Sequence, residues 1–293
     1  MTHTDSELKE IYNLTLSCIN RPGIVAGITV PLFELGADIL EAQQYDDLAE
    51  KRFFMRVAFS AAVPAVDIAV IRDRLVPVAQ AFSLRWQLRA VSQKHRVLIL
   101  ASKADHCLTD LLYRRRIGEL PMHLVGIVSN HPRESLNLPP ADEVPYHHLP
   151  VTADTKDRQE AQIMRIVEES GADLVVLARY MQILSGKLCA YLAGRCINIH
   201  HSFLPGFKGA KPYTQAFEHG VKMIGATAHY VTEDLDEGPI IAQDTLPVSH
   251  VDTPDTLSRK GRDIERRMLA LAVQYHLEDR VLLNGRKTVV FRD

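Results

Sequence analysis

The chain has 293 residues, which is enough for two domains that each bury a core. Hydrophobic residues make up 46% and charged residues 24% of the sequence, the composition of an ordinary soluble globular protein. The 34 basic and 36 acidic residues give a net charge of −2, which excludes a global basic field that would attract nucleic acid.

The cysteines and the N-terminal residues indicate the compartment. Four cysteines lie far apart without a CxxC spacing: Cys18, Cys107, Cys189 and Cys196. This pattern favours free thiols in a reducing environment. The first ten residues are polar and lack the apolar region of a signal peptide. No run approaches the roughly 18 apolar residues that span a bilayer. We expect a cytoplasmic protein without a membrane partner.

Residues 1–92 predict a β-α-β-β-α-β domain of the ferredoxin-like type. The expected elements are strands over 12–18, 39–45, 53–59 and 84–88, with a first helix over 24–35 and a second helix before the last strand. The turn Asn20, Arg21, Pro22 and Gly23 opens the first helix, and Gly36 ends it.

Residues 93–293 predict a second domain in which strands alternate with helices. The expected strands cover 96–101, 123–128, 174–178 and 196–199, and the expected helices cover 108–116, 156–170, 183–193 and 253–274. Such alternation indicates an α/β, Rossmann-like and mostly parallel sheet with helices on both faces. Ligands of such sheets lie at the carboxyl ends of the strands. The loops after Ala101, Val128, Ala178 and Ile199 should therefore surround the site.

The segment from Cys196 to Asp244 concentrates polar side chains among strand-like apolar residues. Asn198 and His200 are two positions apart on an extended segment, so their side chains point to the same face. Asp236, on a loop bounded by Gly238 and Pro239, can be brought beside them. An amide, an imidazole and a carboxylate together can stabilise an oxyanion and move a proton at a carbonyl carbon.

The same segment carries a resemblance to a known family. NIHHSFLP and GATAHYVTEDLDEGPII closely resemble the formyltransferases that use 10-formyltetrahydrofolate, and among them the deformylases, the hydrolases of the group. The resemblance covers the whole chain, because NRPGIV is similar to the strand-to-helix turn of the ACT domain that deformylases carry. It implies hydrolysis of 10-formyltetrahydrofolate to tetrahydrofolate and formate, without a metal or a further cofactor. The implied role is to balance one-carbon folates and to supply formate for purine biosynthesis.

The resemblance also assigns roles to the polar residues. Asn198 and His200 would stabilise the oxyanion, and Asp236 would orient the water and handle protons. His201 should face away from His200 on an extended segment and act as a supporting hydrogen-bonding partner. His229 should support the site by positioning the loop that carries Asp236.

Two further segments are expected to bind the folate substrate. The first follows the strand over 174–178 and contains Arg179, Tyr180, Met181, Gln182, Ile183 and Leu184. The second, which contains Thr232, Glu233 and Asp234, should form the opposite wall. Apolar walls with a few convergent polar groups suit a flat heterocycle.

The turn over 101–107 departs from the pattern of the glycinamide ribonucleotide formyltransferases. Those enzymes hold the phosphate of the amine substrate on a Gly-rich loop at a helix N-terminus. This chain has no glycine there, and Asp105 would repel a phosphate. The site for an amine acceptor therefore looks absent, and water needs no such site.

Three alternatives remain open. The first is transfer of the formyl group to an amine such as glycinamide ribonucleotide or an initiator aminoacyl-tRNA. The second is a metal-dependent amidohydrolase that uses His200, His201, His229 and Asp236. The third is an amino-acid sensor whose ACT domain binds an effector above an inactive catalytic domain.

The N-terminal domain has two expected roles. ACT domains commonly bind amino-acid effectors near the turn formed here by Asn20, Arg21, Pro22 and Gly23, and the resemblance suggests methionine and glycine. Alternatively, the domain only helps to assemble a homo-oligomer. Pairing of such domains predicts at least a dimer.

Overall fold

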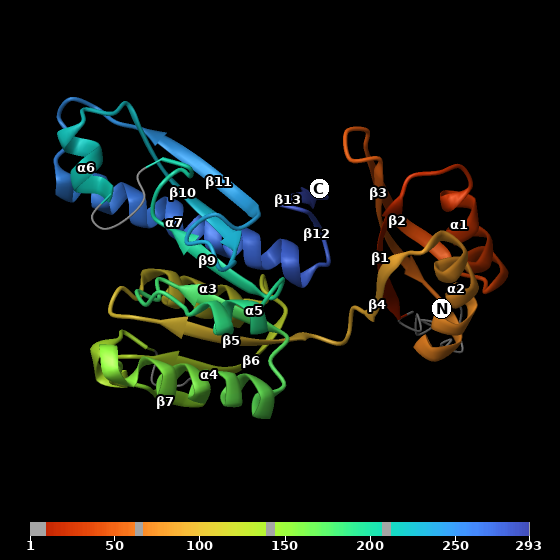
Figure 1. The fold of residues 1–293 in the computed structure, drawn as a ribbon, viewed down its shortest axis with the longest axis horizontal. Helices are drawn as coiled ribbons and strands as arrows, with labels where there is room; N and C mark the ends of the chain where they lie inside the picture. The colour runs from red at the N-terminus through yellow and green to blue at the C-terminus, as the bar shows by residue number, and fades with distance from the viewer. Residues whose placement is uncertain (1–9, 62–66, 139–143, 207–211, 293) are drawn as a thin grey trace, which may run out of the picture. The chain divides into compact units, whose positions relative to one another are not determined.

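The computed structural model describes residues 10–61, 67–138, 144–206 and 212–292. Within these ranges the chain forms two compact units (Figure 1). The first contains the residues up to Lys94 together with 278–282 and 289–292. The second contains 95–277 and 283–288.

The first unit is a four-stranded antiparallel sheet with two helices. The strand order is β2-β3-β1-β4, and the bounds are β1 Ile11–Ile19, β2 Asp38–Asp47, β3 Arg52–Ser60 and β4 Arg85–Ala90. Helix α1 (Ile24–Glu34) follows β1, and α2 (Ile68–Phe82) follows β3. The predicted βαββαβ order is confirmed.

Side-chain alternation gives this sheet an apolar face. Leu14 of β1 lies opposite Val57 of β3 and Leu88 of β4, and all three side chains are buried. Ile28 of α1 and Leu75 of α2 belong to the same hydrophobic core. The apolar side chains on one face of the strands therefore pack against the apolar faces of the two helices in a single core.

The chain returns to the first unit near its C-terminus. Strands β12 (Val281–Asn284) and β13 (Lys287–Val290) form a two-stranded sheet. Just before it, the carboxylate of Asp279 lies 2.6 Å from the guanidinium of Arg89 and accepts a hydrogen bond from Asn13 at 3.0 Å. The division into 1–92 and 93–293 drawn from the sequence does not include this return.

The second unit is a seven-stranded sheet of order β11-β10-β9-β8-β5-β6-β7. Strands β5 to β9 are parallel to their neighbours in this group, and β10 is antiparallel to β9 and β11. The bounds are β5 His95–Ala101, β6 Met122–Ser129, β7 Tyr146–His148, β8 Leu174–Ala178, β9 Cys196–His200, β10 Met223–Tyr230 and β11 Ile240–Pro247. The predicted mostly parallel sheet is confirmed.

Helices cover both faces of this sheet. Their bounds are α3 His106–Arg116, α4 Lys156–Ser170, α5 Gly186–Tyr191, α6 Pro212–Glu218 and α7 Pro254–Leu277, with 3-10 turns at Arg133–Ser135 and Ala153–Thr155. Helix α3 packs against α7, whereas α4 packs against α5 and β6. Figure 1 shows α3 and α4 on opposite sides of β5 and β6.

The central strands are buried along their length, as strands covered on both faces must be. Every side chain of β8 is buried, as is every one from Val97 to Ala101 in β5. Because these strands are parallel, their carboxyl ends meet at one edge of the sheet. The loops that follow them are joined there, since the backbone N–H of Met181 donates to Ser102 Oγ at 3.0 Å.

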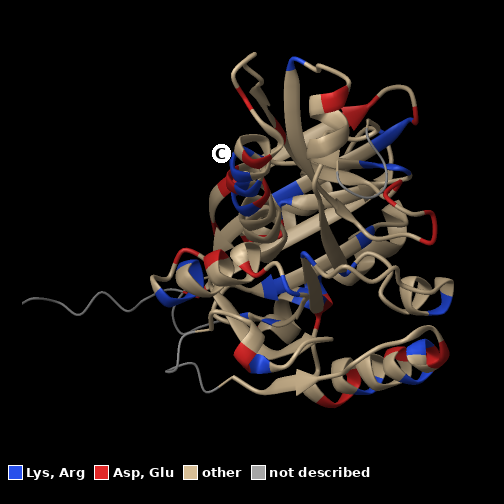
Figure 2. Ribbon diagram, turned by 90° about the vertical axis from the view of Figure 1, so that its left-hand side faces the viewer, with Lys and Arg blue, Asp and Glu red and all other residues tan. Residues whose placement is uncertain are grey.

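No helix within the described ranges is long and apolar enough to cross a membrane. Figure 2 shows Lys and Arg interspersed with Asp and Glu over the described chain. All four cysteines are buried and free of disulfides.

Candidate active site

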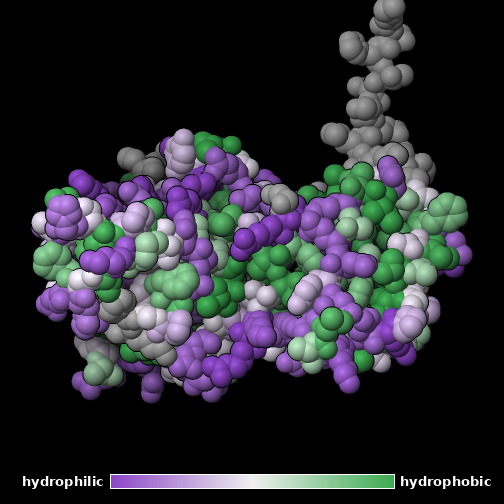
Figure 3. Space-filling model, turned by 90° about the horizontal axis from the view of Figure 1, so that it is seen from above, coloured by the Kyte–Doolittle hydropathy of each residue, from purple (hydrophilic) through white to green (hydrophobic). Residues whose placement is uncertain are grey.

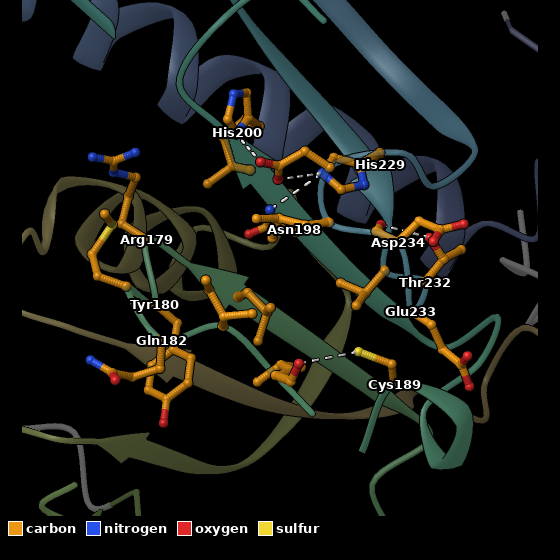
Figure 4. A pocket seen from close by; sticks show the side chains of 18 of the residues that line it. Arg179, Tyr180, Gln182, Cys189, Asn198, His200, His229, Thr232, Glu233 and Asp234 are labelled. Carbon is orange, nitrogen blue, oxygen red and sulfur yellow. Dashed lines mark hydrogen bonds and ion pairs between the residues drawn. The ribbon is translucent and has the colours of Figure 1, made fainter. Parts of the chain in front are cut away.

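A cavity of about 300 Å³ opens at the carboxyl edge of the second sheet. Three segments line it: the loop after β8 over 179–184, the end of β9 over 198–201, and the chain from His229 to Asp236. Figure 4 shows Arg179, Tyr180 and Gln182 on one side and Thr232, Glu233 and Asp234 on another, with Asn198, His200 and His229 between them.

Strand pairing places Asn198 and His229 side by side. The two residues are directly opposite in the antiparallel pair β9–β10, so their side chains lie on the same face. The pairing of β10 with β11 shifts register between Ala228 and His229, the kind of irregularity that redirects a side chain beside an active site. Asn198 Nδ2 lies 3.3 Å from His229 Nε2.

The hydrogen bonds of His229 fix the orientation of Asn198. His229 Nδ1 lies 2.9 Å from the carbonyl oxygen of Tyr230, which can only accept, so Nδ1 carries the hydrogen. In the neutral ring Nε2 is then an acceptor for one N–H of the Asn198 amide. The second N–H of Asn198 remains for another partner.

Asp236 reaches the two histidines from the loop between β10 and β11. Its Oδ2 lies 3.2 Å from His200 Nδ1, and its Oδ1 lies 3.8 Å from His229 Nε2. Burial would raise the pKa of Asp236, but the hydrogen bond and the charge of His200 outweigh burial and hold that pKa well below its ordinary value. The carboxylate is therefore ionised throughout the neutral range.

The loop that carries Asp236 has a constrained backbone. Asp236 itself has φ 57°, in the left-handed region that aspartate and asparagine tolerate better than most residues. Two residues later, a Cβ on Gly238 would lie 1.7 Å from the carbonyl oxygen of Tyr230. Only glycine allows the loop to close so tightly on β10, and this closure sets the position of Asp236.

His200 has one ring nitrogen without a protein partner. The side chain is buried, and its Nδ1 faces Asp236, whereas its Nε2 has no hydrogen-bond partner among the described residues. A buried polar atom without a partner is rare, and it marks a place where a ligand group can bind. The residue lines the cavity.

Alternation along a strand predicted that His201 faces away from His200, but the two side chains lie close together. Strand β9 ends at His200, so the period of two does not extend to the next residue. The two rings lie 5.0 Å apart at 43°, and both residues line the cavity. Burial, followed by the charges of Arg179 and His200, lowers the pKa of His201 to about 3. His201 is therefore neutral at physiological pH.

The loop after β8 supplies one wall of the cavity. Arg179 begins it with φ 62°, which turns the chain away from the strand. Tyr180 is buried, and Gln159 donates to its hydroxyl at 3.0 Å. Burial raises the pKa of Tyr180 to about 12. Met181 and Ile183 are more than half exposed and present apolar surface.

The opposite wall contains Thr232, Glu233 and Asp234, which all line the cavity. Thr232 Oγ1 donates to the carbonyl oxygen of Asp234 at 3.1 Å, which closes this part of the loop. Five apolar residues complete the lining: Leu177, Cys189, Ile199, Val231 and Leu235.

Sequence reasoning missed Glu265 of α7. This carboxylate is 1% exposed, and its Oε2 lies 2.8 Å from His106 Nε2 and 3.3 Å from Arg179 Nε. The available signal was an acidic residue between Ile264 and Met268 on the apolar stripe of a helix. Among the described residues, His106, Cys107 and Glu265 form the one acidic, histidine and cysteine cluster with metal-like spacing. The guanidinium of Arg179 already faces that carboxylate.

Asp105 is engaged within the protein. Its Oδ2 accepts hydrogen bonds from the backbone N–H of Asn137 at 2.8 Å and from Asn137 Nδ2 at 2.9 Å. The carboxylate thus occupies the turn before α3 and ties it to the loop after β6.

The turn expected to bind an effector lies in the first unit, between β1 and α1. Asn20 Nδ2 donates to Asp46 at 2.6 Å, and Arg21 stacks on the Phe82 ring with its guanidinium carbon 4.5 Å from the centroid. Pro22 and Gly23 follow, and Gly23 has φ 93° at the N-terminus of α1. No side chain caps the first turn of that helix.

The second unit matches a known family. The family model described as formyl transferase matches residues 95–273, which include every residue of the cavity. Among curated proteins, the chain is 49% identical to a formyltetrahydrofolate deformylase from Corynebacterium sp. (strain P-1), over 95% of this chain and 97% of that protein.

Solved structures give the same picture. The formyltetrahydrofolate deformylase from Burkholderia mallei has a TM-score of 0.91 and 49% identity, and it covers 97% of this chain and 100% of its own. Glycinamide ribonucleotide transformylase 1 from Symbiobacterium toebii has a TM-score of 0.61 and 30% identity, and it covers 68% of this chain and 95% of its own. The similarity to the deformylases thus extends over nearly the whole chain.

Proposed function

Because the chain belongs to the formyl transferase family as one of its formyltetrahydrofolate deformylases, we propose that Asn198, His200 and Asp236 catalyse its reaction. The enzyme is a hydrolase that converts 10-formyltetrahydrofolate and water to tetrahydrofolate and formate. The observation that carries the proposal concerns His200, which lines the cavity: its Nδ1 faces Asp236, and its buried Nε2 has no hydrogen-bond partner among the described residues.

The first step is the addition of water to the formyl carbon, which creates an oxyanion. Protonated His200 donates its Nδ1–H to Asp236 and its Nε2–H to this oxygen. Asn198 contributes the amide N–H that His229 leaves free. Donors that are already in place where charge develops lower the barrier because they need not reorganise.

Asp236 handles the protons. Its ionised carboxylate orients the attacking water and takes the proton that the water loses as the tetrahedral adduct forms. The proton then passes to N10 of the folate as the C–N bond breaks. His229 supports this role from 3.8 Å, and His201, which is neutral, supports the wall of the site next to His200.

The folate lies between the two walls. The exposed apolar side chains of Met181 and Ile183, with Leu184, offer contact to the flat heterocycle, and the backbone of Arg179 to Gln182 offers polar groups. Thr232, Glu233 and Asp234 bound it from the other side. Tyr180 contributes indirectly, because its buried hydroxyl accepts a hydrogen bond from Gln159 and so anchors the loop that forms this wall.

Water is the only acceptor in this proposal, and no metal takes part. Purified protein given 10-formyltetrahydrofolate alone, with a chelator present, should therefore release formate and tetrahydrofolate in equal amounts. Formate assays over time measure this. Dependence on an added amine would favour the formyl-transfer alternative, loss of activity with the chelator would favour the amidohydrolase alternative, and no release at all would favour the sensor.

Substitution of the catalytic residues should separate chemistry from binding. Asp236→Asn keeps the left-handed backbone but removes the charge, so kcat should fall roughly 10²- to 10⁴-fold. The loss should be the same from about pH 6 to about pH 8, because a carboxyl group with a depressed pKa stays ionised there. Asn198→Ala should cost about 100- to 1,000-fold, the usual value of one oxyanion donor.

Folate affinity, measured by fluorescence titration, should stay near the wild-type value in both variants. Glu237→Gln is the matched control, because this neighbouring carboxylate pairs with exposed Arg286 instead of the histidines. Its rate should stay within about twofold of wild type. An Asp236→Asn enzyme that turns over at the wild-type rate would show that the proton role is misassigned.

The first unit is proposed to be a regulatory ACT domain that binds an amino acid at the turn from Asn20 to Gly23. Calorimetry on the whole chain should show binding of methionine or glycine, with Asn20→Ala reducing it because Asn20 holds the turn through Asp46. Glu34→Gln, half exposed on α1, is the control. The absence of heat with either amino acid would leave assembly as the role of the unit.

Assembly is also proposed, because the first unit exposes apolar side chains around its edge strand β2. Phe33 and Leu48 are about 80% exposed, and Leu40 of β2 is 53% exposed; Figure 3 shows hydrophobic side chains gathered on this unit. Such edges pair readily with another strand. Light scattering should give a multiple of the 32.9 kDa chain mass, and Leu40→Lys should weaken association. A single-chain mass at every concentration would exclude a stable oligomer.

We also propose that the enzyme works in the cytoplasm, where four buried thiols stay reduced. Fractionation of cells that express the chain would test this location.

A further inference from the structure

Glu265 is the centre of a buried polar cluster next to the catalytic cavity. Its Oε2 faces His106 at 2.8 Å and Arg179 at 3.3 Å, and its Oε1 accepts a hydrogen bond from the hydroxyl of Tyr213 at 2.5 Å. We call His106, Arg179, Tyr213 and Glu265 the Glu265 cluster. Its members come from α3, the loop after β8, α6 and α7, so four separate segments meet at one carboxylate.

The cluster adjoins the reacting groups. Arg179 lines the catalytic cavity. The ring of Tyr213 lies 6.4 Å from that of His201, which in turn lies 5.0 Å from the ring of catalytic His200. A second cavity of about 190 Å³ is lined by His201 and Tyr213 among others. Within the cluster, Arg179 therefore borders the catalytic cavity directly, and Tyr213 stands behind His201.

The carboxylate is charged and fully engaged. Burial would raise the pKa of Glu265, but the hydrogen bond from His106, the charge of Arg179 and the hydrogen bond from Tyr213 leave it lowered. Removing any partner would leave a buried charge partly unsatisfied, which is costly. The four side chains of the cluster are thus held in one arrangement by their mutual contacts.

Helix α7 is shaped to admit Tyr213. A Cβ on Gly261, one turn before Glu265, would lie 2.0 Å from the hydroxyl oxygen of Tyr213. Glycine lowers helix stability in a helix interior, yet here it makes room for the ring that reaches Glu265. This is an observation independent of the ion pair.

The neighbouring turn before α3 is occupied in the same way. Asp105 is bonded to Asn137, and Ser102 Oγ donates to Asn130 at 2.7 Å and accepts from Met181. With His106 on Glu265, three polar side chains of this turn, those of Ser102, Asp105 and His106, are used within the protein, whereas Lys103 is exposed. A second substrate could not bind to these three without breaking their contacts.

We propose that the Glu265 cluster determines acceptor specificity by closing the side of the site on which an amine would have to approach the formyl carbon. This inference rests on the proposed catalytic function of Asn198, His200 and Asp236. With the folate between the walls over 181–184 and 232–235, Arg179 and His201 line the cavity beside His200. An acceptor larger than water that approaches the formyl carbon from this side meets these two side chains, with the ring of Tyr213 behind His201.

The excluded reaction is a simple group transfer. The nitrogen of the nucleophile would bond to the formyl carbon, the bond from that carbon to N10 would break, and a proton from the attacking nitrogen would end on N10. It needs no oxidant or reductant. Hydroxylamine is a suitable probe, because it is small and its product, formohydroxamate, is measured separately from formate.

The test measures how the formyl group is divided between water and hydroxylamine at saturating 10-formyltetrahydrofolate, after subtraction of the reaction without enzyme. Wild type should give formate almost exclusively. Tyr213→Ala removes the aromatic ring. Gly261→Ala displaces the ring of Tyr213 and changes no charged residue of the sequence. Each should raise the share of formohydroxamate by about tenfold or more. Tyr213→Phe keeps the ring and should resemble wild type more closely than Tyr213→Ala.

Asp252→Asn is the matched control, since Asp252 is a buried carboxylate just before α7 that pairs with Lys260 at 2.7 Å instead of the cluster. Its product ratio should be that of wild type. If Tyr213→Ala and Gly261→Ala both bind folate and still yield the wild-type ratio, the proposal is wrong. Because the ratio is independent of the total rate, this outcome is distinct from a failure of the catalytic assignment, which would appear as undiminished turnover in Asp236→Asn.

Discussion

The contact between His200 Nδ1 and Asp236 Oδ2, 3.2 Å long, is the interaction on which the site depends. It commits one nitrogen of the ring to the carboxylate and leaves the other, Nε2, without a partner among the described residues. The same contact holds Asp236 in its charged form. In the proposed mechanism, this pair of side chains orients a cation toward the developing oxyanion and keeps a proton acceptor beside it.

The fold supplies this pair by geometry that is largely backbone. Antiparallel pairing of β9 with β10 sets Asn198 opposite His229, and the tight return at Gly238 brings Asp236 back onto the same face. The parallel strand β8 and residues 97–101 of β5 are buried and give the edge a rigid base. His200 and Asp236, which are 36 positions apart, therefore meet without the help of long flexible side chains.

Much of this was readable in the sequence. Alternation along the strand predicted that Asn198 and His200 share a face, and the strand-helix alternation predicted the mostly parallel sheet. The prediction for His201 was wrong because it assumed that the strand continues, whereas β9 ends at His200. Glu265 was missed because its partners His106, Arg179 and Tyr213 come from distant segments. A local pattern cannot register contacts that only the tertiary fold creates.

The return of the chain to the first unit has a consequence for biosynthesis. Asn13 and Arg89 find their partner in Asp279, so two strands made early depend on a residue that lies 190 positions beyond Arg89. Residues 95–277 of the second unit are translated before that residue. The N-terminal sheet, although synthesised before the second unit, thus acquires these contacts only after most of that unit has been made.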